Sequence, residues 1–197
     1  MSSEEVKGNI ILATINCIEQ NGVQAVTIRQ IAEMAKVNVA AVNYHFGSKD
    51  NLVKLALAQT LKEVFVVNVA DHFDGDQDIS SALEDYFKTT LEGAITYPGI
   101  TKAHLYDPFI KSNYNGIFVE KFQIFLEDLR SKIKPLFRDK SEEDIMIIVI
   151  QMFSAIFLPG ILPGLFSKFP EMDFTDSQKR EKYIHFLINQ YFKIHEK

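Results

Sequence analysis

Cysteine is almost absent from this chain, which carries a single one, Cys17. One cysteine excludes an intrachain disulfide and any metal site built from several cysteines, and it is typical of a protein from a reducing cytoplasm. Cys17 lies in an apolar helical pattern. A buried thiol is therefore a simpler interpretation than a redox sensor, which usually needs a neighbouring cation or a second cysteine.

Signatures of catalysis and of bound cofactors are also missing. The sequence has no glycine-rich phosphate loop, no nucleophile elbow and no close histidine and carboxylate spacing, and His104 with Asp107 is too little for a catalytic site. The stretch 71–78 carries four aspartates, but an EF-hand loop needs glutamate at its twelfth position, where this chain has Ala82. We expect a solvated loop there, and neither an enzyme nor a metal or cofactor site.

Alternating strand patterns are lacking, and the N-terminal residues are acidic and polar, unlike a signal or transit peptide. Helical periodicity recurs instead, so the sequence predicts an all-α protein that stays in the cytoplasm. The expected helices cover residues 2–21, 27–35, 38–46, 49–73, 79–97, 100–111, 114–136 and 176–195, with another that begins near residue 145.

The longest apolar run covers residues 145–167, 23 residues without a charge, which is long enough to cross a membrane. Pro159 and Gly160 predict that its helix stops near Leu158, too early for a span. An apolar helix in a soluble chain needs cover on every side, and a second subunit is the natural cover. A stripe on the last helix would complete that interface: Tyr183, Phe186, Leu187 and Tyr191.

Two short helices joined by a tight corner are predicted between Thr27 and Lys49. Thr27 and Gln30 form a capping box at the first helix, and Asn38 is the N-cap of the second. Val26 with Ile31, and Val37 with Val42, occupy the positions of hydrophobic staples. Such short helices are unstable alone, so they need support from the first helix of the chain. The pattern is that of a helix-turn-helix that enters DNA.

Small or flat side chains lie along the second of these helices, where a close approach to base edges and thymine methyl groups would need them. The Val-Ala-Ala run is equally compatible with ordinary helix packing. His45 and Phe46 are better explained as closing the corner against the first helix, although His45 stays a candidate for DNA contact. The candidate DNA-binding residues are Thr27, Arg29, Asn38, Val39, Ala40, Ala41, Asn43, Tyr44, His45 and Lys49.

The stretch from Thr27 to Lys49, with Tyr44-His45-Phe46 followed by Gly47-Ser48-Lys49, resembles the DNA-binding domain of the TetR family of bacterial transcriptional regulators. The resemblance implies that Thr27 and Tyr44 touch phosphates, that Lys49 pairs with a backbone phosphate, and that residues 39–43 face the major groove. It also implies dimerisation through the last two long helices and a small, largely apolar effector.

Two positions depart from the family pattern. Asn43 stands where the family often has an aromatic residue, and its amide could pair bidentately with adenine. Lys36 stands where the corner commonly has glycine, so a left-handed backbone there would cost roughly 1–2 kcal/mol. The basic excess over residues 27–54 is small, with four cations against two anions, in a chain of net charge −5. Phosphate binding would therefore depend on neutral donors and on two copies side by side.

The region after residue 60 is rich in phenylalanine and tyrosine, which can leave an apolar pocket between helices but also simply fill a core. Polar residues in apolar stretches are better ligand candidates, because a buried polar group needs a partner. For each of these polar residues an internal hydrogen bond is the better explanation. The candidate ligand-binding residues are Asn68, Tyr86, Thr90, His104, Phe122 and Gln151.

Together these observations predict a helix-turn-helix domain at residues 1–48 and a helical ligand-binding and dimerisation domain at residues 49–197. The expected function is a TetR-like regulator, a repressor that binds a near-palindromic double-stranded DNA operator as a homodimer and is released by a small apolar effector. The alternative is a helical protein-interaction or membrane-associated module without sequence-specific DNA binding.

Overall fold

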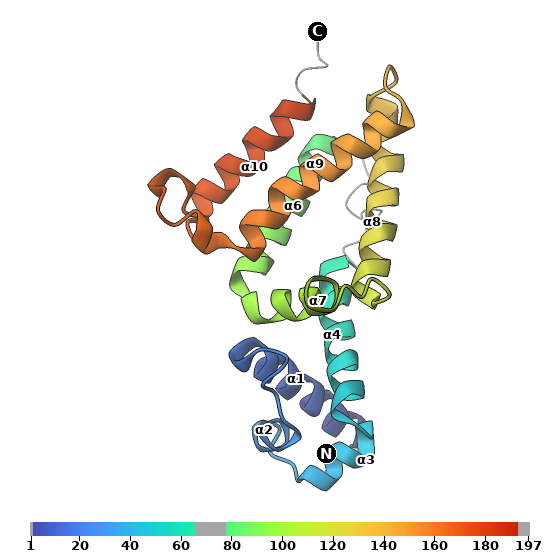
Figure 1. The fold of residues 1–197 in the computed structure, drawn as a ribbon, viewed down its shortest axis with the longest axis vertical. Helices are drawn as coiled ribbons and strands as arrows, with labels where there is room; N and C mark the ends of the chain where they lie inside the picture. Colours follow the sequence, from blue (N-terminus) through green and yellow to red (C-terminus); the bar gives the residue numbers. More distant parts are fainter. Residues whose placement is uncertain (1, 66–77, 193–197) are drawn as a thin grey trace. The chain divides into compact units, whose positions relative to one another are not determined.

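The computed structural model describes residues 2–65 and 78–192. Asn68 and most of the acidic stretch 71–78 lie outside the described residues, as does the expected continuation of the fourth helix beyond Phe65. The described residues form helices and no strands, so the all-α prediction is confirmed. The helices are α1 (Ser3–Asn21), α2 (Ile28–Met34), α3 (Val39–Phe46), α4 (Lys49–Phe65), α6 (Ile79–Thr96), α7 (Pro98–Lys111), α8 (Ile117–Ile133), α9 (Glu142–Ile161) and α10 (Ser177–Phe192) (Figure 1).

The helices form two compact units that are discontinuous in sequence. Unit 1 comprises residues 1–66 and 97–119, and unit 2 comprises residues 67–96 and 120–197. Helix α7 thus packs with α1 and α4, although α6 separates it from them in the chain. These two units are defined by which helices pack together, and not by function. The predicted functional boundary between residues 48 and 49 stays a prediction.

Local capping explains where the short helices of unit 1 begin. The Thr27 hydroxyl accepts from the N–H of Gln30, whose side chain accepts from the N–H of Thr27 in return. The Asn38 side chain accepts from the N–H of Ala41 at 2.7 Å. Ser2 and Glu5 form the same capping box at α1, and Gly22 follows its last residue. The predicted caps are therefore confirmed, and each satisfies backbone donors that a helix start leaves unpaired.

The core of unit 1 joins α1, α2, α3, α4 and α7. Ile18, Ile31, Val42 and Leu52 are fully buried together. Ile100 and Ala103 of α7 belong to the same core cluster. The supporting role expected of the first helix is confirmed, and α4 and α7 share it. This cover supplies the stability that α2 and α3 lack as isolated helices.

The corner between α2 and α3 contains the departure noted at Lys36. Its φ is 55°, in the left-handed region, and its N–H bonds to the carbonyl of Glu33. A side chain with a Cβ is strained in this conformation, whereas glycine is not. The corner therefore keeps the left-handed shape that glycine would favour.

Unit 2 is built on α6, α9 and α10, which pack against one another (Figure 1). Helix α9 buries Ile145, Val149, Met152 and Ile156. Its approach to α6 is close, because a Cβ at Gly160 would lie 3.0 Å from the Cβ of Ala94. The part of α8 from Glu120 onward joins this unit through aromatic contacts with α6 and α9.

The prediction that the apolar helix stops near Leu158 is wrong, because α9 runs from Glu142 to Ile161 with Pro159 inside it. Proline has no N–H, so it leaves the carbonyl of the residue four positions earlier without its helical donor. Here that residue is Ala155. The Tyr183 hydroxyl of α10 donates to the Ala155 carbonyl at 2.9 Å and so satisfies it from outside the helix.

Replacing Lys36 with glycine should stabilise unit 1, because glycine adopts the left-handed conformation without a Cβ clash. We expect a gain of about 1 kcal/mol in the free energy of unfolding, measured by urea denaturation. The matched control is Lys54→Gly, an exposed position inside α4, which should cost about 1 kcal/mol. A loss of stability in Lys36→Gly would contradict the strain.

Removing the Tyr183 hydroxyl should destabilise unit 2 only while Pro159 is present. Tyr183→Phe should lower the free energy of unfolding by about 1 kcal/mol, because it leaves the Ala155 carbonyl without a donor. In a Pro159→Ala background the restored N–H replaces that donor, and the cost should shrink. Denaturation of the two single variants and the double variant measures this coupling. Equal costs in both backgrounds would refute the compensation.

Candidate nucleic-acid interface

Helix α3 divides cleanly into a buried face and an exposed face. Val42 and Phe46 point into the core of unit 1, at 0% and 7% exposure. On the other face Tyr44 is 85% exposed and Val39 is 41% exposed, with Ala40 and Asn43 exposed between them. An exposed helical face with only short side chains beside one protruding tyrosine can approach base edges closely.

The exposed amide of Asn43 has the chemistry best suited to a base contact on this face. An asparagine amide both donates and accepts, which matches the N6 and N7 atoms of adenine. Ala40 next to it, and half-buried Ala41, leave room for thymine methyl groups. The candidates on α3 thus lie at one surface, and their contacts with DNA stay predictions.

The two capping residues have part of their hydrogen-bonding capacity occupied. The Thr27 hydroxyl donates to the Gln30 side chain at 2.9 Å, so a phosphate would have to compete for that proton. Asn38 uses its side-chain oxygen to cap α3, which leaves its amino group to donate outward. Arg29 is exposed on α2, where a guanidinium can reach a phosphate.

Three consecutive aromatic rings end α3. Phe46 is buried, and His45 is half-buried with its ring in edge-on contact with those of Tyr44 and Phe46, at centroid distances of 5.1 Å and 6.3 Å. Phe46 therefore closes the corner, as predicted. The His45 ring contacts the neighbouring Tyr44 ring, and a direct contact of His45 with DNA stays a prediction.

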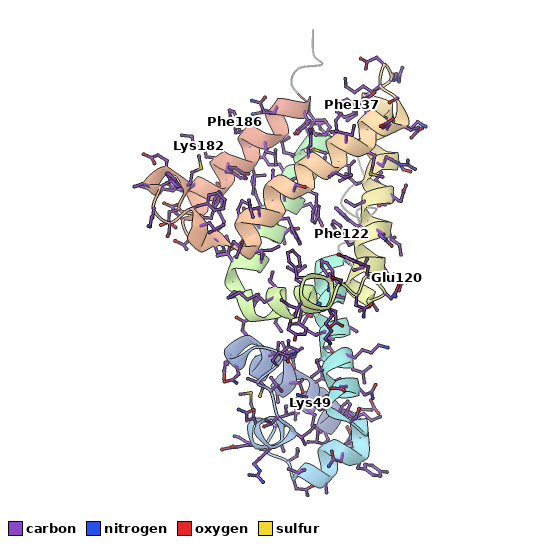
Figure 2. All side chains as sticks on the ribbon, in the orientation of Figure 1. Lys49, Glu120, Phe122, Phe137, Lys182 and Phe186 are labelled. Atoms are coloured by element: carbon purple, nitrogen blue, oxygen red, sulfur yellow. The ribbon has the colours of Figure 1, made fainter. Side chains whose placement is uncertain are left out.

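Lys49 ties the start of α4 to the start of α2. Its Nζ donates to the carbonyl of Val26 at 3.1 Å, and the side chain reaches inward from α4 (Figure 2). An ammonium group has three donors, so this bond leaves capacity for a phosphate. Asn51, which sequence reasoning missed, donates to the Phe46 carbonyl at 3.0 Å and fixes the same corner. Ser48 caps the start of α4 by accepting from the N–H of Asn51 at 3.2 Å, and the three-residue spacing of these two residues was the only sequence signal for Asn51.

Four of the candidate ligand-binding residues, Tyr86, Thr90, Phe122 and Gln151, lie in the described part of unit 2. Tyr86 of α6 stacks on Phe125 at 4.9 Å, and Phe125 and Phe122 of α8 both contact Phe153 of α9. Burial raises the pKa of Tyr86 to about 12, against an opposing hydrogen bond with Thr90. The phenol is therefore neutral at physiological pH. We call Tyr86, Phe122, Phe125, Phe153 and Phe157 the aromatic cluster.

The structure places His104 apart from this cluster, in unit 1. Its Nε2 lies 2.9 Å from the Thr60 hydroxyl, and its ring stacks on Phe118 at 5.9 Å. Thr60 directs its hydroxyl proton to the Leu57 carbonyl, which assigns the hydrogen of the shared bond to His104 Nε2. Burial lowers the pKa of His104 to about 4, so the ring is neutral at pH 7 and ties α7 to α4.

Gln151 lies on the exposed side of α9 and accepts from the Tyr191 hydroxyl of α10 at 3.1 Å. Tyr191 also lines a surface hollow of about 380 Å³ along α10. The hollow is lined by the four residues of the predicted stripe and one more polar residue, namely Tyr183, Phe186, Leu187, Tyr191 and Gln190. Phe186 is 63% exposed and projects from the outer side of α10 (Figure 2).

Comparison with known proteins places the helix-turn-helix in a family. Residues 10–56 match the sequence model described as "Bacterial regulatory proteins, tetR family". The nicotine-responsive transcriptional repressor HdnoR of Paenarthrobacter nicotinovorans is 33% identical over 79 residues, and the transcriptional regulator BetI of Paraburkholderia phytofirmans is 27% identical over 59 residues. These alignments span 40% of this chain and of HdnoR, and 30% of this chain and of BetI.

The whole fold is also shared. A solved structure from Mesorhizobium loti, assigned to the TetR-family transcriptional regulators, superposes with a TM-score of 0.74 at 14% identity and covers 98% of each chain. At that identity the likeness concerns the fold alone. The match over residues 10–56, the exposed face of α3 and the shared helical architecture agree with one another, and the helix-turn-helix region of this chain is similar to that of the TetR family of bacterial regulatory proteins.

Proposed function

We propose that this chain is a TetR-like transcriptional regulator, a repressor that binds a near-palindromic operator as a homodimer in the cytoplasm. The observation that carries the proposal is the exposed face of α3, with Asn43 and Tyr44 presented to solvent while Val42 and Phe46 anchor the helix. Recognition helices of this class enter the major groove with such a face.

Phosphate contacts position the protein in this proposal. Tyr44, Arg29, Asn38 and Lys49 each carry a donor at the rim of the α2–α3 corner. Because the corner is only weakly basic, one copy gains little from phosphate neutralisation. Two copies on two half-sites double both the base contacts and the phosphate contacts, which favours a two-fold symmetric operator.

The second copy is proposed to dock on the outer faces of α9 and α10. Ile147, Ile150 and Leu158 of α9 are each between 45% and 49% exposed, and they fall at helical spacing on one face. The hollow lined by Phe186 lies on α10. Exposed apolar residues on two packed helices of one unit are typical of a buried face between subunits.

The aromatic cluster is the proposed site of a small apolar effector. Its members come from α6, α8 and α9, so a ligand that separates their rings would move these helices. Tyr86 adds one polar group, which could orient a ligand through a hydrogen bond. Thr90, one turn away, is part of the same site. His104 and Gln151 form their hydrogen bonds with Thr60 and Tyr191, outside the aromatic cluster, so they are not part of this proposed effector site.

A membrane-associated or protein-interaction module is the alternative. Helix α9 has the length and the apolar composition of a membrane span, yet 44% of its apolar window is buried inside the protein. The first turn of α9 carries three acidic residues, Glu142, Glu143 and Asp144, and the helix packs against α6 and α10. A soluble dimer obtained without detergent would argue against membrane insertion.

Selection of random duplex DNA by the purified protein tests the proposal. The wild-type protein should enrich a two-fold symmetric site near physiological salt, and Tyr44→Ala should lose at least about tenfold in affinity for it, because an exposed phosphate contact is removed. Tyr114→Ala is the matched control, an exposed tyrosine elsewhere in unit 1. If a folded, dimeric wild-type protein enriches nothing, the interaction-module alternative replaces the regulator.

A charge at the proposed subunit face should separate the dimer. Phe186→Glu should weaken dimerisation by about 2 kcal/mol or more, because it places a carboxylate in an apolar contact. Analytical ultracentrifugation measures the dissociation constant. Ile124→Glu replaces another exposed apolar residue, on α8, and should leave it unchanged. Dimers of equal strength in both variants would exclude this face.

A further inference from the structure

Lys36 occupies the corner between α2 and α3 in a backbone conformation that lowers stability. Its φ is 55°, in the left-handed region where a residue with a Cβ is strained. Glycine would adopt the same conformation without that strain, so a side chain at this position needs a reason other than folding. Strained residues cluster at functional sites, where the surrounding structure holds them in place.

The backbone of the corner explains how the strain is held, but it does not explain why the residue is a lysine. The N–H of Lys36 donates to the Glu33 carbonyl at 3.1 Å, and the N–H of Val37 donates to the Ala32 carbonyl at 2.9 Å. Both bonds join backbone atoms, so neither depends on the lysine side chain. The same two bonds would form with glycine at position 36.

The ammonium group of Lys36 is also not used inside the protein. The residue is exposed, and none of the residues that the structure describes forms a hydrogen bond or an ion pair with this ammonium. Two other lysines of unit 1 do pair, Lys7 with Glu4 and Lys111 with Asp107, each at 2.8 Å. A structural ion pair therefore does not account for the lysine at the corner.

Lys36 lies directly before the helix that carries the proposed reading face. Only Val37 separates it from Asn38, the N-cap of α3, so the Cα atoms of Lys36 and Asn38 are at most about 7 Å apart. Val39 and Ala40 follow, and both are exposed. DNA phosphates flank the groove that such a helix enters, and a lysine on its flexible four-carbon stem binds a phosphate as a point charge.

We propose that Lys36 is a phosphate-binding residue, whose ammonium contacts the DNA backbone beside the N-terminus of α3 and so offsets the strain of the corner. This inference rests on the proposed function and adds a contact that a glycine at the corner does not supply. The contact matters because the region is weakly basic. Residues 27–54 carry four cations and two anions, a net charge of +2, which falls to +1 without Lys36.

Three substitutions at this position separate the charge from the strain. Lys36→Gly removes both, Lys36→Ala removes the charge and keeps the Cβ, and Lys36→Arg keeps both. Binding to the operator recovered from the selection is measured by fluorescence anisotropy over a series of salt concentrations. Lys36→Gly and Lys36→Ala should each lose at least about fivefold in affinity near physiological salt, and the slope of log K against log salt should become shallower by about 0.9 for each bound copy. Lys36→Arg should bind like the wild-type protein.

Stability and binding should move in opposite directions in Lys36→Gly. This variant should unfold at a higher urea concentration than the wild-type protein, as predicted above, and yet bind the operator less tightly. Lys36→Ala should bind as weakly as Lys36→Gly but without the gain in stability, because its Cβ keeps the strain. General damage to unit 1 would lower stability and affinity together, so it does not produce this combination.

Lys102→Ala is the matched control for the loss of charge. Lys102 is an exposed lysine of α7, which lies at the opposite end of unit 1 from α3 (Figure 1). Its removal should leave the operator affinity and the salt slope unchanged. A loss in Lys102→Ala as large as that in Lys36→Ala would show a general effect of net charge and would overturn the contact at the corner.

Lysine acetylation provides a measurement that does not depend on affinity. Acetic anhydride modifies exposed lysines, and digestion followed by mass spectrometry reports the extent of modification at each one. Lys36 should react in the free protein and be protected when the operator is bound, whereas Lys102 should react equally in both states. Equal modification of Lys36 with and without the operator would overturn the proposal.

The choice of DNA separates a phosphate contact from a base contact. A phosphate contact weakens binding on every sequence, so Lys36→Ala should also lose affinity for random-sequence duplexes. A loss confined to the operator would overturn the assignment to phosphate. Wild-type affinity in Lys36→Gly and Lys36→Ala would overturn this inference and leave the proposed function standing, whereas a wild-type protein that binds no DNA would overturn the proposed function itself.

Discussion

The burial of two very short helices is the constraint on which unit 1 depends. Helices of seven and eight residues do not persist alone in water, and here Ile31, Val42 and Phe46 hold α2 and α3 to the surrounding helices. One face of α3 must therefore be apolar and fully covered, and only the other can present groups to a ligand. The division of α3 into anchor and reading face follows from this requirement. Lys36 shows how tightly the corner is determined, since its backbone adopts a strained conformation that the sequence could have avoided with glycine.

Features that depend on near neighbours in sequence were predictable, and those that depend on distant ones were not. The caps at Ser2, Thr27 and Asn38 involve residues three positions apart, and each formed as expected. The extension of α9 through Pro159 was missed because the donor that compensates for proline comes from Tyr183, on another helix. The site shows the same pattern. The exposed face of α3 could be predicted from helical periodicity. The hydrogen bond between His104 and Thr60, by contrast, joins residues 44 positions apart and has no signal in the local sequence, so the sequence did not show that His104 belongs to unit 1 and lies apart from the aromatic cluster.

The two units carry separate chemistry. Unit 1 has an exposed polar surface with donors at its rim, and unit 2 has an aromatic interior with one buried phenol and an apolar outer face on α9 and α10. A regulator needs these properties in one chain, because DNA must be read at a hydrated surface while an apolar effector must be held away from water.

The discontinuity of unit 1 has a consequence for protein engineering. Chimaeric regulators are commonly imagined as an exchange of one continuous N-terminal segment, cut just after the helix-turn-helix. In this chain such a cut would remove the hydrogen bond that the N–H of Ile100 in α7 donates to the Glu19 side chain of α1 at 2.9 Å. It would also separate Gly99 from the backbone of Glu19, against which it packs, and leave the place of Ile100 in the core of unit 1 to be filled by a foreign helix. A transplantable DNA-reading module would have to carry residues 97–119 with it, or recreate a glycine and an apolar residue at the equivalent places in the recipient.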